Sequence, residues 1–227
     1  DTHGQIGKKL VKIIREDVMD SIVWDKSNIN DWSASSLKSL LNGAYYNAQD
    51  GTNSGYCYGL RADLAVNCDY TKKGIQSQYR NMVVNVTWHL GGYKDNTATS
   101  EEFYKYERGT TVYSGRPTTT TGYIGLIYPS DYGYSVLSSS CARTKILDSY
   151  SNCADQSWLY YGGEEWTITH YSNASYMAFY LSSGELCTNN NAHAINGYLY
   201  RPVIYLDSSV YIIDGDGTLD KPYIIGM

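Results

Sequence analysis

Charged residues and phenylalanine are scarce in this 227-residue chain. Charged residues make up 18% of it, and only 2 Phe accompany 25 Tyr, whereas an average soluble domain is about one quarter charged. The net charge is −5 and the basic residues are scattered, so the sequence offers no basic surface for nucleic acid. No apolar run approaches the ~18–20 residues that a transmembrane helix needs. We therefore expect neither a nucleic-acid partner nor a transmembrane segment.

Tyrosine carries most of the aromatic content. Its ring is apolar and its hydroxyl is polar, so tyrosine suits surfaces that are half buried and half wet, such as binding faces and subunit contacts. Cross-strand packing in a β-rich fold is the alternative use of so many tyrosines. Composition alone leaves both open.

Five cysteines bear on where the protein works. Cys57 and Cys68 form one closely spaced pair, and Cys141 and Cys153 form another, each in a segment rich in Gly, Ser, Asn and Asp. Such pairs favour disulfide-pinned loops of an exported protein over a zinc site, because no Cys-x-x-Cys and no neighbouring His completes a ligand set. Cys187 is left over, as a small buried residue or a free thiol. The start of the sequence has no signal-peptide pattern, which leaves either a mature or trimmed product or an intracellular protein. The cysteine pairs favour the first, so we expect an extracellular or cell-surface protein.

Local patterns predict helices mainly in the first half of the chain. Apolar residues recur at helical spacing between residues 33 and 46, with serines available as the N-cap. Residues 71–82 are expected to form a second, short helix. Thr99 and Glu102 have the spacing of a capping box, which predicts a third helix beginning there.

Antiparallel strands are expected mainly in the second half, which we predict to be strand and turn from residue 123 onward. The predicted strands cover residues 7–16, 83–90, 158–161, 166–169, 175–181, 198–206 and 210–213. No linker or composition break divides the chain, so we predict one α+β domain over residues 1–227. Residues 47–70, which hold the first cysteine pair, are expected to be an inserted loop.

Three segments together carry a family resemblance. They are Glu107-Arg-Gly-Thr-Thr-Val-Tyr-Ser-Gly-Arg116, Ile124-Gly-Leu-Ile-Tyr-Pro-Ser-Asp-Tyr-Gly-Tyr134, and the closing region from Tyr198 through Arg201-Pro-Val-Ile-Tyr-Leu206 to Ile225. The chain resembles a module of pilin-like and other exported surface proteins of Gram-positive bacteria. That module is related to the C-type-lectin-like fold, in the branch shared with formylglycine-generating enzymes. The resemblance implies a display scaffold, in which Arg201 anchors a buried polar contact and the last hairpin returns to the sheet as a structural clasp.

One departure from the family concerns the first strand. The family has a strand with a Trp-Arg-hydrophobic pattern before the segment that corresponds to residues 9–15, and only residues 1–6 precede it here. Either the domain boundary was trimmed or that strand comes from elsewhere. A missing strand would leave an open sheet edge that accepts a neighbour's strand.

The acidic turn near the C-terminus is a candidate calcium loop. Asp214, Asp216 and Asp220 alternate with glycine, but the closing glutamate of an EF-hand is missing. A hairpin turn built from Asp and Gly is the alternative, and we expect no cofactor. The chain also lacks the Glu-Pro-Asn, Gln-Pro-Asp and Trp-Asn-Asp strings with which lectin-like domains bind calcium and sugar.

Catalysis is not expected. The formylglycine-generating enzymes that the chain resembles look like copper oxidases built on two neighbouring cysteines, and this chain offers Cys187 alone in the corresponding half. A Cys187–His193 nucleophile with Glu164 or Glu165 rests on residue types only. An oxidase-type enzyme on this scaffold is therefore the least favoured function.

Two stretches have the composition of an adaptable binding face. Residues 170–176 and 188–193 concentrate Tyr, Asn, Ser and His, the residues that paratopes favour. In the family resemblance they flank the ligand-facing surface; two solvated loops are the alternative. The candidate ligand-binding residues are Tyr171, Asn173, Tyr176, Asn189, Asn190, Asn191 and His193.

The favoured function is a non-catalytic extracellular module, surface-bound or pilus-associated, that binds or displays. Its partner would be an unidentified protein or glycan. The alternative is a structural subunit of an extracellular filament, in which tyrosine-rich faces form the contacts of self-assembly. The sequence names neither the ligand nor the source organism.

Overall fold

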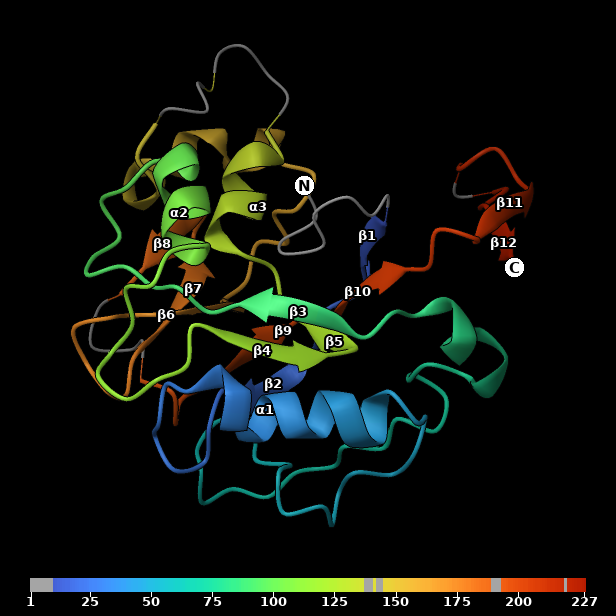
Figure 1. Cartoon of the computed structure of the whole chain (residues 1–227), viewed down its shortest axis with the longest axis horizontal. Helices are drawn as coiled ribbons and strands as arrows, with labels where there is room; N and C mark the ends of the chain where they lie inside the picture. The colour runs from blue at the N-terminus through green and yellow to red at the C-terminus, as the bar shows by residue number, and fades with distance from the viewer. Residues whose placement is uncertain (1–9, 137–140, 142–144, 189–192, 219) are drawn as a thin grey trace.

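The computed structural model of the chain describes residues 10–136, 141, 145–188, 193–218 and 220–227. These residues form a mixed α+β fold of many short strands and few helices. Figure 1 shows the helices α2 and α3 above the strands and α1 below them. The predicted α+β class is therefore correct.

The largest sheet has five strands in the order β2-β9-β6-β7-β8. Their bounds are β2 Met19–Val23, β9 Gly197–Tyr200, β6 Glu165–His170, β7 Ala178–Ser182 and β8 Glu185–Cys187. Neighbouring strands are antiparallel except β6 and β9, which are parallel. Every residue of β6 is buried, so this central strand is covered on both faces, including its polar residues.

A second sheet joins the two ends of the chain. Strand β1 (Val11–Ile14) pairs with β10 (Val203–Leu206), and β10 pairs with the short β5 (Ile124–Gly125). Beside it, β3 (Val86–His89) and β4 (Thr119–Gly122) form an antiparallel pair. The predicted strands at 7–16, 83–90 and 198–206 are thus found with shorter bounds, and the last of them is split at Pro202.

The expected helix at 33–46 is present as three consecutive turns of different pitch. A 3₁₀ turn (Trp32–Ala34) leads into α1 (Ser36–Leu40), whose N-cap Ser35 accepts a hydrogen bond from the Lys38 amide. The helix continues as a π-helical turn over Leu41–Tyr45. For residues 71–82 the prediction was too long, since only Ser77–Met82 coils, as 3₁₀ helix.

Helix α2 (Ser100–Glu107) begins where the capping box predicts. The Thr99 amide donates to Glu102 Oε2 at 2.9 Å, and the Glu102 amide donates to Thr99 Oγ1 at 3.3 Å. These reciprocal bonds satisfy two amide donors that a helix start leaves unpaired.

Two predictions for the second half were wrong. Residues 129–134 form a helix, α3 (Pro129–Tyr134), because Pro129 fits the first helical position and Asp131 accepts the Tyr128 amide. Further 3₁₀ turns cover Leu147–Ser149 and Ser151–Gln156. Residues 158–161 are not a core strand: Trp158 is 66% exposed and Tyr161 is 54% exposed.

Tyrosine and tryptophan supply most of the aromatic core, beside the buried Phe103 and Phe179. Trp24, Trp88 and Trp166 are fully buried, and each indole N–H donates to a backbone carbonyl on another strand: Thr167, Gly122 and Ile22, respectively. Six tyrosines also have fully buried side chains: Tyr128, Tyr132, Tyr150, Tyr180, Tyr200 and Tyr205. Much of the tyrosine surplus is therefore core packing.

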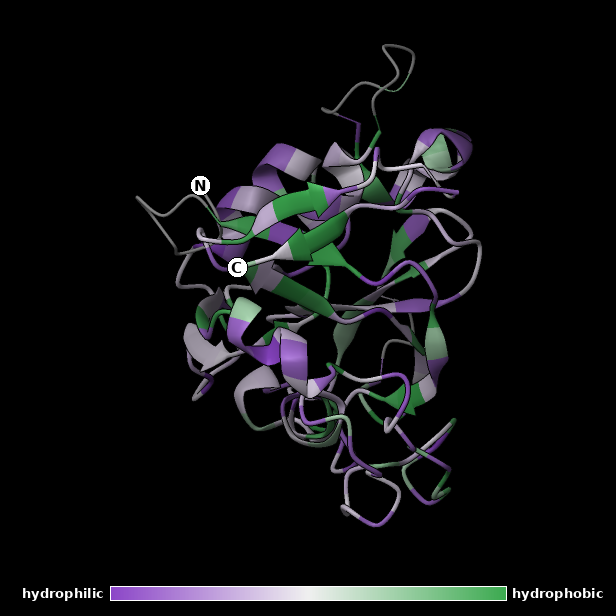
Figure 2. Cartoon of the chain, turned by 90° about the vertical axis from the view of Figure 1, so that its right-hand side faces the viewer, coloured by the Kyte–Doolittle hydropathy of each residue, from purple (hydrophilic) through white to green (hydrophobic). Residues whose placement is uncertain are grey.

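The closing hairpin differs from the expected clasp. Strands β11 (Tyr211–Asp214) and β12 (Ile224–Gly226) pair only with each other among the described residues. Every residue of β11 is exposed. Figure 1 shows this hairpin projecting at the side of the molecule, and Figure 2, viewed from that side, shows β11 and β12 mostly in the hydrophobic colour. The last strand does not return to a main sheet, so that prediction was wrong.

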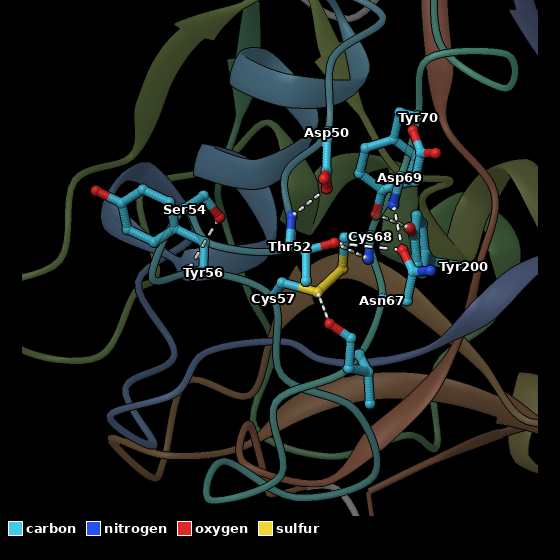
Figure 3. Close-up of a disulfide and its surroundings, with 11 residues drawn as sticks. Asp50, Thr52, Ser54, Tyr56, Cys57, Asn67, Cys68, Asp69, Tyr70 and Tyr200 are labelled. Atoms are coloured by element: carbon cyan, nitrogen blue, oxygen red, sulfur yellow. Dashed lines mark hydrogen bonds between the residues drawn. A yellow bond between two sulfur atoms is a disulfide. The ribbon is translucent and has the colours of Figure 1, made fainter.

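Both predicted disulfides are present, Cys57–Cys68 and Cys141–Cys153. Figure 3 shows the first one inside the predicted insertion at 47–70, where the Gly51 amide donates to the Cys68 carbonyl at 2.9 Å. The same segment returns to the core through Tyr70, whose hydroxyl lies 2.6 Å from that of Tyr200. Two disulfides are compatible with an extracellular protein. Among the described residues, no helix has the length and apolar character to cross a membrane.

Candidate ligand-binding face

The connection between β6 and β7 forms a short loop over residues 171–177. It closes by a hydrogen bond from the Tyr171 amide to the Met177 carbonyl at 3.0 Å. The Ser172 amide donates to the Tyr93 carbonyl at 2.8 Å, and this ties the loop to a second segment. The Tyr171 ring packs edge-on against buried Phe179, with centroids 6.1 Å apart.

Asn30 fixes this loop from beneath. Its side chain is fully buried, and its Nδ2 lies 3.0 Å from the Tyr171 carbonyl, 2.6 Å from that of Ala174 and 2.9 Å from that of Met177. The Asn30 amide donates to the Ser175 carbonyl at 2.9 Å. The two N–H groups of this amide are therefore shared among three inward-facing carbonyls, and they set the loop's conformation.

Arg116 completes the attachment. Its Nε donates to Asn30 Oδ1 at 3.3 Å, and one terminal nitrogen donates to the Ser175 carbonyl at 3.1 Å. The guanidinium also lies 5.7 Å from the centre of the Tyr113 ring. Asn30 and Arg116, from two segments distant along the chain, thus hold loop 171–177 in one conformation.

An aromatic pair joins Tyr176 of the loop to His193 of a later segment. The rings of Tyr176 and His193 meet edge-on with centroids 4.7 Å apart. Met177 and His193 form a β-bridge, and the Ala194 amide donates to the Tyr176 carbonyl at 2.8 Å. Tyr176 is 38% exposed, and Asn173 is exposed beside it.

The structure thus brings together four of the seven candidates: Tyr171, Asn173, Tyr176 and His193. Asn189, Asn190 and Asn191 lie outside the described residues. Asn30 and Arg116 were missed by the sequence reasoning. Their partners are distant along the chain, so no local pattern could have identified them.

His170 opens the same polar stretch but belongs to the interior. It is buried at the end of β6 and accepts a hydrogen bond from the Tyr113 amide at 3.3 Å. Burial, with a smaller contribution from nearby Arg116, lowers the pKa of His170 to about 4. The ring is therefore neutral at neutral pH and serves as an acceptor for loop packing.

Arg201 makes the buried contact that the sequence predicted. Its Nε and one terminal nitrogen donate to the two oxygens of Glu165, each at 2.8 Å, and the same nitrogen donates to the Leu159 carbonyl. Both side chains are at most 5% exposed. Desolvation raises the pKa of Glu165, and the bond to Arg201 lowers it. The pair joins β6 to the segment between β9 and β10.

Glu107, at the end of α2, is a second buried carboxyl. It accepts hydrogen bonds from the Ser130 amide at 2.9 Å and the Ser130 hydroxyl at 2.5 Å. Burial raises the pKa of Glu107 to about 8, an effect that Ser130 partly opposes. It links α2 to α3.

The groups considered for catalysis are engaged in packing. Glu165 is paired with Arg201. Cys187 is half-buried in β8, and burial raises the pKa of its thiol, so it lacks the lowered pKa of a reactive cysteine. The His193 ring packs edge-on against Tyr176. The other four cysteines are in disulfides.

The acidic turn is organised by its own hydrogen bonds. Asp216 Oδ1 accepts from the Thr218 amide at 3.1 Å and the Thr218 hydroxyl at 2.7 Å, while Asp214 lies 3.3 Å from Lys221. Asp220 is exposed. In the part of the chain that is described, no three His, Cys, Asp or Glu side chains gather as a metal site. This geometry fits the turn alternative.

Comparisons with known proteins found no similar protein. A scan against protein-family models, a search of curated proteins and a search of solved structures each found no match.

Proposed function

We propose that this chain is a non-catalytic extracellular binding module on a C-type-lectin-like scaffold, displayed at a cell surface or on a pilus. The observation that carries the proposal is the Tyr176–His193 pair on a loop that Asn30 and Arg116 hold in place. A loop that is ordered before binding loses little conformational entropy when a ligand arrives. The exposed Tyr176, the half-buried His193 and the exposed Asn173 supply stacking and hydrogen-bonding surfaces for a protein or glycan ligand.

Two further observations support an extracellular binding role over chemistry. The two disulfides are compatible with an oxidising compartment. The buried titratable groups Glu165, Glu107 and His170 each have a packing partner in the interior. We therefore assign these groups to the packing of the fold and assign ligand binding to the exposed polar side of loop 171–177.

The test is a glycan and protein array screened with the isolated chain, followed by titration calorimetry on each positive ligand. Tyr176→Ala is expected to weaken binding by at least about tenfold, because a central aromatic contributes about 2 kcal/mol at an interface. Tyr161→Ala is the matched control, since Tyr161 is also exposed but lies on a different segment. Equal loss in both variants, or none in Tyr176→Ala, would refute the assignment of this face.

A further inference from the structure

Lys12 and Asp131 come from distant parts of the chain, and their side chains are in direct contact. Lys12 Nζ lies against Asp131 Oδ2 across a sequence separation of 119 residues. Lys12 belongs to β1, and Asp131 lies in the first turn of α3. The two side chains are only 22% and 21% exposed. The contact is therefore shielded from water much more than an ordinary surface ion pair.

Two aromatic rings flank the lysine. Its Nζ lies 4.9 Å from the centre of the Tyr128 ring and 5.9 Å from that of Tyr205. Both tyrosines are fully buried, and the Tyr205 hydroxyl has no hydrogen-bond partner among the described residues. Burial, and next the negative charge of Asp131, raise the pKa of Tyr205. An unpaired O–H donor thus lies near the Asp131 carboxyl, where it can stabilise an oxygen that gains negative charge.

Glu107 supplies a second carboxyl beside this contact. It is fully buried and accepts hydrogen bonds from Ser130, the residue before Asp131. Burial is the main cause that raises the pKa of Glu107 to about 8, and the charges of Asp131 and Lys12 act on it in opposite directions. Glu107 therefore holds its proton at neutral pH. A neutral buried acid of this kind can give one proton and take another during a reaction.

We propose that Lys12 and Asp131 condense into an isopeptide bond, a covalent amide between their two side chains. An amine held against a carboxyl reacts as if its concentration were about 10⁵–10⁸ M. The surrounding groups supply what the step needs, namely donors for a negative oxygen and a carrier for protons. Lys105 and Glu101 form the opposite case, since they also touch but are more than half exposed and lie along one face of α2.

The step balances without an oxidant or a reductant. One proton passes from the Lys12 ammonium to the Asp131 carboxylate, and the amine then attacks Asp131 Cγ, which forms the N–C bond. The Tyr128 amide, which donates to Asp131 Oδ2 at 2.9 Å, and the Tyr205 hydroxyl stabilise the negative oxygen of the tetrahedral intermediate. Glu107 gives its proton to the departing oxygen and takes one from the nitrogen. The C–O bond breaks, and one water leaves.

This bond joins β1 to α3 and adds a third covalent link to the fold. The two disulfides join cysteines only 11 and 12 residues apart, whereas Lys12 and Asp131 are 119 residues apart. A link that closes a longer loop restricts the unfolded chain more strongly. The role of the bond is thus to hold the fold together, and it does not depend on ligand binding at loop 171–177.

The test is the intact mass of the whole chain, measured unfolded and with the disulfides reduced. Wild type is expected to be lighter than its sequence by one water, and digestion should join the peptide of Lys12 to that of Asp131. Lys12→Arg keeps the positive charge but offers no amine, so it should have the full mass of its sequence. Lys105→Arg is the matched control, because Lys105 also contacts a carboxylate, that of Glu101 at 2.7 Å. It should keep the loss of one water.

Timed cell-free synthesis tests the part of Glu107. Glu107→Gln cannot exchange a proton and is expected to slow formation of the bond by at least about a hundredfold, while thermal unfolding shows that the variant is folded. An unchanged rate would refute the role of Glu107 in the step. A wild type with the full mass of its sequence would overturn the proposal. So would a water lost within one linear peptide, such as a succinimide at Asp214-Gly215.

Discussion

Loop 171–177, which connects strands β6 and β7, and the hairpin formed by β11 and β12 are held in opposite ways. The loop is polar and is tied from beneath by Asn30 and Arg116 through carbonyls that face inward. The hairpin is apolar, and its described polar contacts, such as Asp214–Lys221, lie at the surface. A polar loop can thus be held in place by hydrogen bonds within the chain. The apolar side chains of the hairpin, in contrast, remain exposed and contribute little to the stability of the fold.

The largest expected effect on the free energy of unfolding comes from comparing the buried ion pair Arg201–Glu165 with the exposed pair Lys221–Asp214. Arg201→Met leaves the Glu165 carboxylate buried without its partner, and loss of one member of a buried pair costs about 3–5 kcal/mol. Lys221→Met removes an exposed pair, which contributes about 0–1 kcal/mol. Urea denaturation of both variants measures the difference. Similar losses of unfolding free energy in the two variants would mean that the ion pair of the hairpin contributes as much to stability as the buried pair.

Glu107 gives a pH-dependent test of the interior. Its pKa in the folded state is about 8, above the ordinary value of about 4.3, so the folded protein binds this proton more tightly than the unfolded chain. Its stabilising contribution is complete below the unfolded pKa and is lost as pH rises through about 8. Glu107→Gln cannot ionise. We expect the variant to gain a few kcal/mol relative to wild type between about pH 5 and 9.

Chemical denaturation at each pH measures that gain. Glu101→Gln, on the exposed side of α2, is the control because it leaves the interior unchanged. A constant difference between Glu107→Gln and wild type across the range would contradict burial as the cause of the shift.

Asn30→Ala tests how the loop is held. The change leaves inward-facing carbonyls of loop 171–177 without their donor, and an unsatisfied buried polar group costs about 1–3 kcal/mol. Asn173→Ala, on the exposed side of the same loop, should change stability by less than about 0.5 kcal/mol. Hydrogen exchange should show faster exchange of the Ser172 amide in Asn30→Ala alone. Unchanged protection would show that Arg116 suffices to order the loop.

The smallest expected effect is on the hairpin. Ile212→Ala should alter the stability of the monomer by less than about 0.5 kcal/mol, because the side chain is already 55% exposed. The same change at Ile168, which is 1% exposed, should cost about 2–5 kcal/mol. Thermal unfolding of dilute protein compares the two. A large loss at Ile212 would mean that the hairpin is packed in the monomer.

Local chemistry accounts for the features that could be predicted from the sequence. The Thr99–Glu102 capping box works within one helical turn, and each disulfide closes a short loop. The helix at 33–46 was predictable because its buried residues recur at helical spacing. Arg201 was assigned a buried polar contact from the family resemblance, and Glu165 supplies it.

The failures come from contacts between distant segments. Trp158 is large and aromatic, as core residues often are. In the structure it is exposed and lines a groove together with residues of β1 and α3. Residues 129–134 fall in the region predicted as strand and turn but form a helix that begins at Pro129. For the candidate site, residue type suggested Tyr176 and His193, while their proximity depends on the pairing of Met177 with His193. Asn30 carries no local sign that it holds that loop.

The pairing of β1 with β10 has a consequence for biosynthesis. Val11 lies opposite Leu206, so β1 must wait for a partner strand that is synthesised much later. Synthesis proceeds at about 5–20 residues per second, and through most of that time β1 has no sheet to join. Contacts of such long sequence separation also slow folding. The nascent chain therefore carries β1 without its partner until Val203–Leu206 have been made, and this interval is when a chaperone would be needed.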